Sequence, residues 1–183
     1  MNKDYKKIVE TTLKILDKKA WNHITLKEVQ IKSKVKKFNL LIKNKKNLLI
    51  YINNYFDYKV LSKVSSIETS NYKDMIFEVI MMRFDVLQEN RKGVKSIFDS
   101  FKQKHKLLLF FLPLLLDSIL IMLKSINLPI KGVLCQLKIK GIFFIYISIF
   151  FVWLNDETTA LDKTMTALDQ HLNQANNFLK FIN

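Results

Sequence analysis

Apolar residues recur along this chain every three to four positions, which is the spacing of one face of an α-helix. In the first predicted helix, residues 5–18, Ile8, Val9, Leu13 and Leu16 lie on such a face. The chain has only three glycines and two prolines, and no alternating apolar and polar stretch is bounded by turn dipeptides. The pattern therefore predicts an all-α protein.

The helical period predicts about nine helices in two domains. The predicted helices span residues 5–18, 25–32, 36–42, 45–63, 72–89, 91–102, 106–126, 129–154 and 158–181. Thr25 and Glu28 have the spacing of a capping box, in which the threonine hydroxyl accepts the Glu28 backbone N–H and the carboxylate reaches back. A polar stretch then separates a small N-terminal domain, residues 1–64, from a larger domain, residues 65–183.

The last predicted helix has a regular apolar seam. Its apolar residues alternate by four and three positions, the spacing of helices that pack at a shallow angle. Such a seam fits either the chain's own core or one half of a four-helix interface between two copies. The apolar character of the preceding helix favours a homodimer, with an interface formed by Leu161, Met165, Leu168, Leu172, Ala175 and Leu179.

Two long apolar runs, residues 107–123 and 141–154, are similar to membrane spans in composition. A span needs about 20 largely apolar residues, whereas Pro113 and Asp117 interrupt the first run and the second has 14 residues. Buried helices are therefore the favoured interpretation. Cys135 is the single cysteine, which excludes an internal disulfide, and no secretory signal is recognisable. We expect a cytoplasmic protein.

Positive charge is concentrated at the N-terminal end of the chain. Of the net charge of +14, the first 65 residues carry +11, with sixteen lysines, no arginine and five acidic residues. Seven lysines occur between Lys32 and Lys46 without a carboxylate. AT-rich coding favours lysine throughout a chain, yet residues 66–183 carry only +3. The asymmetry predicts a polyanionic partner, either nucleic acid or an anionic membrane surface.

The sequence contains no recognisable catalytic or cofactor motif. Phosphate-binding loops, dinucleotide fingerprints and nucleophile elbows need glycines at set spacings, and the three glycines are scattered. His23, His105 and His171 lie far apart and lack metal-ligand spacing. Asp156 and Glu157 stand at a predicted helix start, where acidic side chains favour the positive end of the helix dipole. An enzyme, a cofactor and a bound metal are therefore not expected.

The three short N-terminal helices have the order of a helix-turn-helix, whose third helix enters the DNA major groove. In such a module the starts of the second and fourth helices contact phosphates, while the third helix meets base edges. Lysine can donate to guanine, and asparagine can pair with adenine. The same lysines could instead form a solvated face or lie on anionic lipid. The predicted DNA contacts are Thr25, Lys27 and Lys45 for phosphates, and Lys34, Lys36, Lys37 and Asn39 for base edges.

A series of motifs between Ile8 and Leu49 indicates a known family. In order, they are an apolar first helix, Trp21, Ile24-Thr25-Leu26 opening the second helix, Val29, Val35, and Asn44-Lys45 followed by Leu48-Leu49. This segment resembles the DNA-binding region of TetR-type transcriptional regulators. The resemblance implies a TetR-like fold, with a helix-turn-helix module and a larger helical domain for ligand binding and dimerisation.

The C-terminal part carries more specific motifs at residues 83–88 (RFDVLQ), 112–115 (LPLL), 152–156 (VWLND) and 161–169 (LDKTMTALD). They resemble a bacterial branch of that family, which is similar to the lipid-binding accessory proteins of ubiquinone biosynthesis. Those proteins share the TetR fold and bind isoprenoid lipids without reading DNA.

This second resemblance leaves two functions open: a ligand-responsive regulator on double-stranded DNA, or a lipid-binding accessory protein with a degenerate helix-turn-helix. Either function implies a hydrophobic small molecule or lipid in the larger domain. Ordinary core packing is the alternative explanation for the same aromatic-rich residues. The implied pocket residues are Phe84, Phe110, Phe111, Met122, Phe144, Tyr146 and Trp153.

The turn before the third helix departs from the family pattern. The family has Gly-Val-Ser where this chain has Lys34-Val35-Lys36, and glycine suits the positive φ of such a turn, which lysine adopts only at a cost. The segment between Val35 and the fourth helix is also about two residues shorter than the pattern, and two residues rotate a helix by ~200°. A short or redirected third helix would favour nonspecific DNA contact over specific reading.

Overall fold

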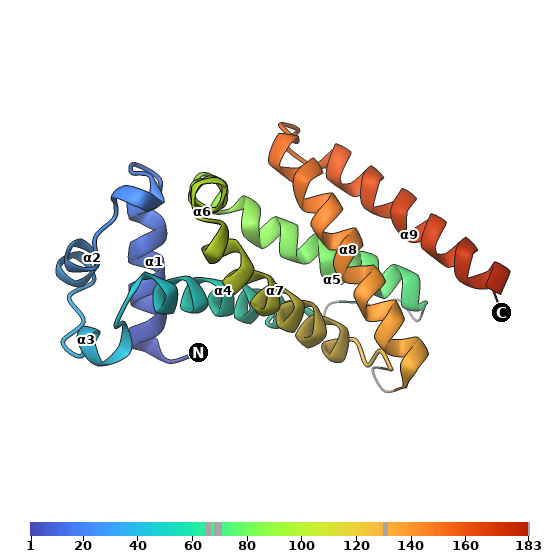
Figure 1. Ribbon diagram of the computed structural model, residues 1–183, viewed down its shortest axis with the longest axis horizontal. Coiled ribbons are helices and arrows are strands. Elements are labelled where there is room, and N and C mark those ends of the chain that lie inside the picture. Colours follow the sequence, from blue (N-terminus) through green and yellow to red (C-terminus); the bar gives the residue numbers. More distant parts are fainter. Residues whose placement is uncertain (65–66, 68–70, 130–131, 183) are drawn as a thin grey trace. The chain divides into compact units, whose positions relative to one another are not determined.

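The computed structural model describes residues 1–64, 67, 71–129 and 132–182, without the side chains of residues 133, 134, 176 and 178–182. Within these residues the chain forms nine α-helices, one 3₁₀ helix and no strand (Figure 1). The predicted all-α class is confirmed. The α-helices are α1 (Lys3–Leu16), α2 (Leu26–Ser33), α3 (Phe38–Leu41), α4 (Lys45–Leu61), α5 (Tyr72–Gln88), α6 (Arg91–Gln103), α7 (His105–Ser125), α8 (Val133–Asn155) and α9 (Asp162–Ile182), and the 3₁₀ helix η1 is Trp21–His23.

The helices belong to two compact units that alternate along the sequence. The first unit contains Met1–Lys59 and Val86–Ser118, and the second contains Val60–Asp85 and Ile119–Asn183. Helices α4, α5 and α7 therefore contribute residues to both units. The predicted domain boundary after residue 64 meets positions outside the described residues, so it stays a prediction.

Three helices differ clearly from their predicted bounds. Helix α3 is a single turn, since Ile42 is already extended (φ −122°, ψ 104°) and its N–H donates to the Phe38 carbonyl oxygen at 2.8 Å. Helix α8 begins at Val133 rather than residue 129, after Gly132 with φ 96°. Helix α9 begins at Asp162 rather than residue 158, because a hydrogen-bonded connection occupies the residues before it.

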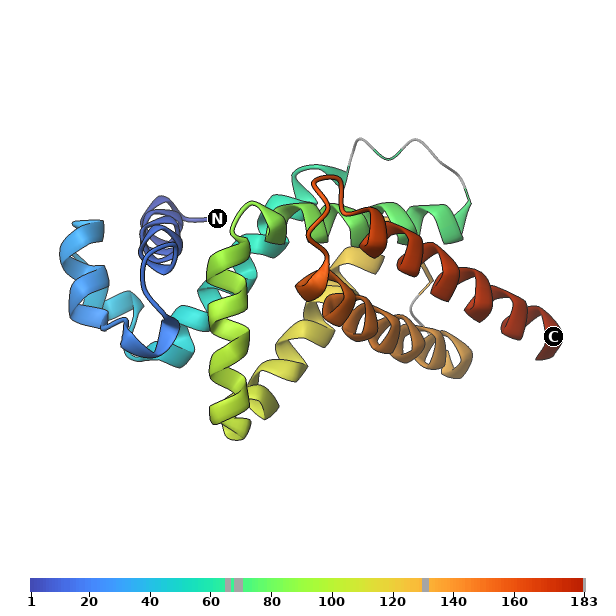
Figure 2. The same cartoon turned by 90° about the horizontal axis from the view of Figure 1, so that it is seen from above.

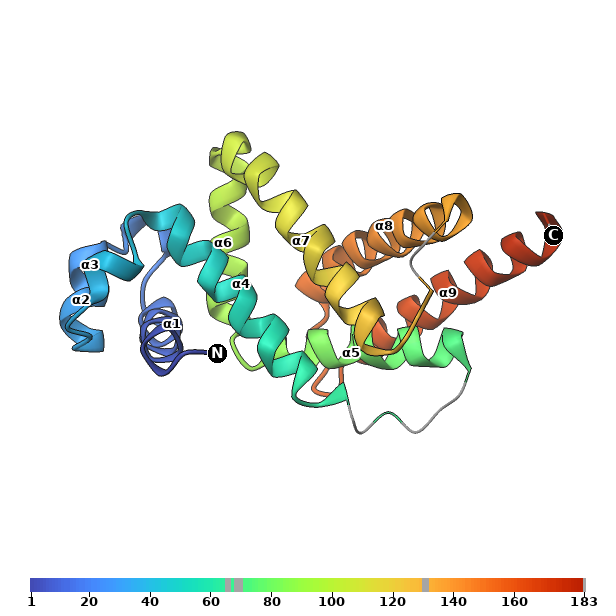
Figure 3. The ribbon, with the colours of Figure 1, turned by 90° about the horizontal axis from the view of Figure 1, so that it is seen from below.

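In the first unit, α1 packs against α2 and α6. Gly93 on α6 permits close approach to α1, because a Cβ atom there would lie 3.2 Å from the Leu16 Cβ. Helices α6 and α7 meet at a sharp corner near Lys104 (Figure 3). The core of this unit is apolar and includes Ile8, Val9, Leu13, Leu16, Trp21, Ile24, Val29, Phe38, Leu48, Leu49 and Phe101.

In the second unit, α8 and α9 lie side by side (Figure 2). The connection between them is organised by Asp156, whose Oδ1 accepts the N–H and hydroxyl of Thr158 at 3.0 and 2.6 Å. Its Oδ2 accepts the N–H and hydroxyl of Thr164, in the first turn of α9, at 2.8 and 2.7 Å. Burial alone would raise the pKa of Asp156, but these hydrogen bonds hold that pKa well below its usual range.

Two helices are long and apolar enough, by length and composition alone, to cross a membrane. They are α7 and residues Cys135–Asn155 of α8, and only 22% and 33% of their most apolar stretches are buried within the chain. Pro113 lies inside α7 without ending it. The favoured interpretation, buried helices rather than membrane spans, therefore stays a prediction, since most residues of both helices keep some exposure within this chain.

Candidate nucleic-acid interface

A four-residue turn joins α2 to α3. Lys34 ends α2 in the left-handed conformation (φ 52°, ψ 31°), and its N–H donates to the Gln30 carbonyl oxygen at 3.1 Å. Val35 is buried beneath the turn, and its carbonyl oxygen accepts the Phe38 N–H at 3.3 Å. A left-handed backbone costs a non-glycine residue roughly 1–2 kcal/mol. Lys34 therefore adopts the positive φ that the comparison with the family pattern led us to expect, with its conformational cost.

The turn and α3 present polar side chains to solvent. Phe38 and Ile42 are buried and anchor the single turn of α3 to the core. Thr25 caps α2, with its hydroxyl accepting the Glu28 N–H at 3.1 Å. Six of the seven predicted DNA contacts are exposed, namely Thr25, Lys27, Lys34, Lys36, Lys37 and Asn39.

Lys45, the seventh predicted contact, is engaged inside the module. Its Nζ donates to the carbonyl oxygens of Trp21 at 2.8 Å and Asn22 at 3.2 Å, and lies 5.5 Å from the centre of the Trp21 ring. Burial, and then the neighbouring Lys104, lower the pKa of Lys45. This side chain therefore ties the start of α4 to η1, a role that was not predicted from the sequence, and its phosphate contact stays a prediction.

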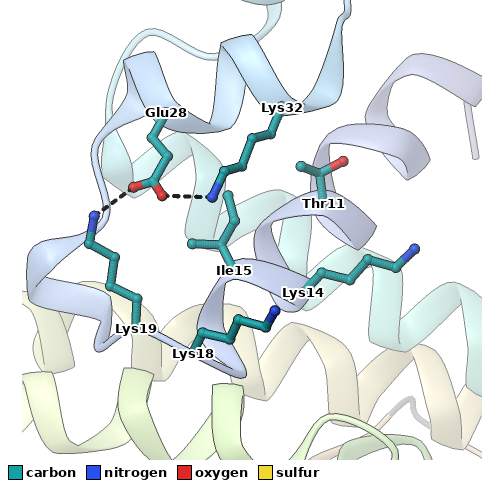
Figure 4. Close-up of a pocket in the computed structure, with 7 residues that line it drawn as sticks. All are labelled: Thr11, Lys14, Ile15, Lys18, Lys19, Glu28 and Lys32. Atoms are coloured by element: carbon teal, nitrogen blue, oxygen red, sulfur yellow. Dashed lines mark hydrogen bonds and ion pairs between the residues drawn. The ribbon is translucent and has the colours of Figure 1, made fainter.

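A basic pocket of about 500 Å³ lies between α1 and α2, lined by Thr11, Lys14, Ile15, Lys18, Lys19, Glu28 and Lys32 (Figure 4). Lys19 and Lys32 converge on the Glu28 carboxylate at 2.8 and 2.9 Å, as Figure 4 shows. Hydrogen bonds from these two lysines lower the pKa of Glu28. The carboxylate half of the predicted capping box is thus replaced by ion pairs, and positive charge predominates in the pocket.

Tyrosine contacts hold α4 against α1. The rings of Tyr5 and Tyr51 stack with their centres 4.2 Å apart, and the Tyr51 hydroxyl donates to the Tyr5 hydroxyl at 3.2 Å. One turn further, the Tyr55 hydroxyl donates to the Glu10 carboxylate at 3.2 Å. Burial, and then the Glu10 charge, raise the pKa of Tyr55 to about 12. The raised pKa keeps the phenol protonated, and able to donate to Glu10, at a pH where an ordinary tyrosine ionises.

The residues predicted to line a ligand pocket do not form one group. Phe110 and Phe111 lie in the first unit, whereas the other five lie in the second. The ring of Phe111 is 5.3 Å from that of Phe101. Phe144 is 69% exposed, so it does not line an internal cavity of the single chain, and its predicted place in the pocket is corrected.

Four of the predicted pocket residues share one core. Phe84, Met122, Tyr146 and Trp153 are buried in the second unit. The Phe84 ring stacks on Tyr146 with centres 5.3 Å apart and lies 6.3 Å from Trp153. Arg83, which was not predicted as part of this core, is buried here, and its Nε donates to the Tyr146 hydroxyl at 3.1 Å. Its position within an apolar stretch of α5 was the available signal.

The predicted dimer seam on α9 is largely covered by the chain itself. Leu161, Leu168 and Leu172 are buried in the second unit, and α9 packs on α8. Met165 is exposed, and Ala175 is half-buried. The Leu179 side chain lies outside the described residues. The burial of these three leucines therefore favours the alternative interpretation, in which the seam packs on the chain's own core.

A buried polar cluster joins α4 to α7 in the first unit. The Ser118 hydroxyl donates to the Asp57 carboxylate at 2.8 Å, and the Asn53 amide donates to Asp57 at 3.2 Å and to the Ser118 hydroxyl at 2.8 Å. All three side chains are buried. The sequence offered one signal for the cluster, because Asn53 and Asp57 stand four residues apart on an apolar helix.

No group of three or more histidine, cysteine, aspartate or glutamate side chains could hold a metal ion within the described part of the chain. His171 packs within the α8–α9 pair, with Nδ1 2.8 Å from the Ala167 carbonyl oxygen and Nε2 3.5 Å from the Ser148 hydroxyl.

Searches with family sequence models and against curated protein sequences return no match. A search of solved structures finds the crystal structure of a TetR transcriptional regulator from Nitrosomonas europaea ATCC 19718, with a TM-score of 0.76. That similarity covers 96% of this chain and 99% of the other, at 18% sequence identity. The predicted TetR-like fold is therefore confirmed.

Proposed function

We propose that this protein is a TetR-like transcriptional regulator that binds double-stranded DNA as a cytoplasmic homodimer. One observation carries the proposal: a helix-turn-helix whose α3 is a single turn exposes its lysines on a segment without acidic residues. From Val29 to Phe56 the sequence has no aspartate or glutamate, and Lys34, Lys36 and Lys37 are exposed around the turn. A phosphate backbone is the partner that such a surface fits.

The rigidity of this module supports the proposal. Lys45 ties α4 to η1, and Phe38 and Ile42 anchor α3. Rigid elements hold base-contacting side chains more accurately than loops do. A one-turn α3 offers few side chains to base edges, so we expect phosphate contacts to supply most of the affinity.

A homodimer would cover the outer face of α8. Leu137, Phe144 and Phe151 recur every seven residues on this helix and are 64%, 69% and 50% exposed. The small residue Gly141 lies between the first two of them, whereas the hydroxyl of Ser148 lies 3.5 Å from Nε2 of His171 on α9. Large and small side chains in a four-three spacing fit the shallow packing of two helices. We therefore place the dimer contact on α8, together with the exposed Met165 of α9.

A ligand that changes DNA affinity is part of this proposal. The core around Phe84, Tyr146 and Trp153 would open to admit a hydrophobic molecule and alter the spacing of the two helix-turn-helix modules. Such coupling requires the ligand to bind one arrangement better than the other. The second candidate, an isoprenoid- or quinone-binding accessory protein, is favoured by the uncovered apolar surface of α7 and α8. Its basic face would then lie on anionic membrane.

A salt series with duplex DNA tests the proposed function. Full-length protein is used to select duplexes from a randomised pool, and the best duplex is compared with a scrambled one between 50 and 200 mM salt. For each duplex, log affinity should fall linearly with log salt, and the selected duplex should bind at least ~1,000-fold more tightly. Salt-sensitive binding without preference would reject the regulator.

Extraction into organic solvent followed by mass spectrometry separates the second candidate from the first. A stoichiometric isoprenoid lipid, together with DNA binding that lacks sequence preference, would favour the accessory protein. Protein that carries no isoprenoid would reject that candidate, whatever the result with DNA.

A further inference from the structure

Leu40 on α3 has an unusual position for a large apolar side chain. It is 75% exposed, more than any other large hydrophobic side chain in the described part of the protein. Phe38 and Ile42, two residues to either side, are buried. Because two residues rotate a helix by ~200°, Leu40 lies on the side of α3 opposite the core.

The backbone holds Leu40 in this outward position. The N–H groups of Leu40 and Leu41 donate to the Lys37 carbonyl oxygen at 3.1 and 3.3 Å, and the Ile42 N–H closes the turn on Phe38 at 2.8 Å. The exposure is therefore a property of a hydrogen-bonded turn with buried anchors. An exposed leucine forfeits the favourable free energy of burial, so binding of a partner that covers this side chain would be favoured by the hydrophobic effect.

The neighbours of Leu40 indicate the chemistry of that partner. Lys36, Lys37 and Lys43 are exposed nearby in the sequence, and the closest acidic residues are Glu28 and Asp57. The surface is thus one apolar side chain within a cationic border. A partner with dense negative charge and a small apolar group fits it, and duplex DNA has both, because thymine presents a C5-methyl group in the major groove.

Asn39 distinguishes DNA from a lipid surface. It is exposed, and none of the hydrogen bonds within the described residues involves its side-chain amide. In lipid hydrocarbon an amide without partners is costly. In the major groove the same amide can pair with N6 and N7 of adenine. Asn39 and Leu40, adjacent in the chain, therefore suit the two halves of A·T base pairs.

The rest of the module lacks the side chain that reads guanine most strongly. Arginine forms a rigid two-pronged contact with guanine, whereas lysine acts as a flexible point charge. The two arginines of the chain, Arg83 and Arg91, lie outside the helix-turn-helix. On α3, the side chains that can contact base edges with a defined geometry are thus the amide of Asn39 and the side chain of Leu40.

We propose that Leu40 is a specificity-determining residue that contacts the C5-methyl group of thymine, so that each half-site includes an A·T pair. The inference rests on the proposed function, since it requires α3 to enter the major groove. It also gives the class of DNA sequence that the protein prefers. The most exposed leucine and the adjacent free amide account for the preference together.

The test uses deoxyuridine, which pairs like thymidine but lacks the C5-methyl group. Full-length protein selects its preferred duplex from a random pool, and each thymidine of that duplex is then replaced singly. For one thymidine per half-site, the replacement should weaken wild-type binding roughly fourfold, the effect of one buried methyl group. Leu40→Ala should bind the thymidine and deoxyuridine duplexes equally.

Two further variants test whether the discrimination depends on Leu40 itself and on the neighbouring amide. Leu109→Ala removes a leucine that is 67% exposed on α7, and it should retain the fourfold discrimination. Asn39→Ala should lower the preference for adenine at one position by at least about fivefold. Both Leu40 and Leu109 are exposed, so neither substitution removes a core contact, and circular dichroism should be unchanged.

The outcomes distinguish a failure of the proposed Leu40 contact from a failure of the proposed regulator function. A selected duplex that binds specifically but is indifferent to deoxyuridine, or whose discrimination survives Leu40→Ala, overturns the role of Leu40 and leaves the regulator intact. Failure to select any sequence rejects the regulator and the inference together. Binding to phosphatidylserine vesicles that depends on Leu40, without a methyl-dependent effect on DNA, assigns the leucine to membrane and also overturns the inference.

Discussion

The helix-turn-helix, residues 21–46, and the α8–α9 pair, residues 133–182, show two opposite ways of using a helical surface. In the first, most apolar side chains, such as Val29 and Phe38, are buried, and lysines face solvent together with Leu40 and Ile31. In the second, α9 buries its leucines while α8 leaves Phe144 and Phe151 exposed. The first surface suits a polyanion, whereas the second suits an apolar partner.

The two regions also differ in how each accommodates a left-handed residue. Lys34 (φ 52°) ends α2 with an exposed side chain, so its conformation is supported mainly by the backbone around it. Leu161 (φ 57°) precedes α9 with a buried side chain, and nearby Asp156 accepts four hydrogen bonds. A positive φ is therefore tolerated for different reasons in the two regions. At Leu161 the burial of the side chain offsets the conformational cost, whereas at Lys34 an exposed side chain offers no such compensation.

The largest expected effect comes from reversing charge on the helix-turn-helix. The triple variant Lys36→Glu, Lys37→Glu, Lys43→Glu should weaken DNA binding roughly 1,000-fold at 0.1 M salt, because each lost phosphate contact forfeits about one released counterion. Fluorescence anisotropy with a labelled duplex measures the change and the reduced salt slope. The matched triple Lys138→Glu, Lys140→Glu, Lys163→Glu alters the same charge in the other region. Equal losses in both variants would mean that the overall charge, and not this surface, attracts DNA.

The next effect concerns the apolar face of α8. Phe144→Glu with Phe151→Glu should raise the dimer dissociation constant about 100-fold or more, because two charges would enter an apolar interface. Sedimentation equilibrium measures the constant. Leu109→Glu, which changes an equally exposed residue of α7, should leave it unaltered. A wild-type protein that sediments as a monomer at all concentrations would contradict the proposed contact.

A substitution of Asp156 tests how much its hydrogen bonds stabilise the α8–α9 connection. Asp156→Asn should lower the free energy of unfolding by about 2 kcal/mol at pH 7, because the carboxylate accepts charge-assisted hydrogen bonds from Thr158 and Thr164. Since the pKa of Asp156 is lower in the folded than in the unfolded state, its contribution is present above about pH 4 and is lost as the pH falls further. Urea unfolding of both proteins from pH 7 to pH 3 should show the difference narrowing at the acidic end. A constant difference would show that lost packing explains the effect.

The smallest effect separates the two left-handed residues. Lys34→Gly should stabilise the protein by about 1 kcal/mol, since glycine adopts positive φ without steric cost. Leu161→Gly should instead destabilise it, because the loss of a buried leucine exceeds that gain. Chemical denaturation gives both values. Destabilisation by Lys34→Gly would indicate that the Lys34 side chain stabilises the turn.

Much of the fold could be predicted from local pattern, but the site could be predicted only in part. The spacing of apolar residues located the helices, the departure at Lys34 indicated a strained turn, and the shortened segment after Val35 indicated a short α3. The roles of Lys45 and Ser118 could not be read from the chain, because their partners lie 24 and 61 residues away. Phe144 was misplaced for a related reason: in a helix that is apolar on every side, periodicity does not indicate which face the core covers.

The sequence by itself determined the all-α class, the lysine-rich helix-turn-helix and the absence of acidic residues from Val29 to Phe56. These follow from helical periodicity, local capping and charge, which depend on residues close together in the chain. Only the tertiary structure decided that the leucines of α9 are buried, that Phe144 is exposed, and that Leu40 faces away from the core. Burial depends on elements that are distant in sequence, and it decides which side chains remain available to a partner.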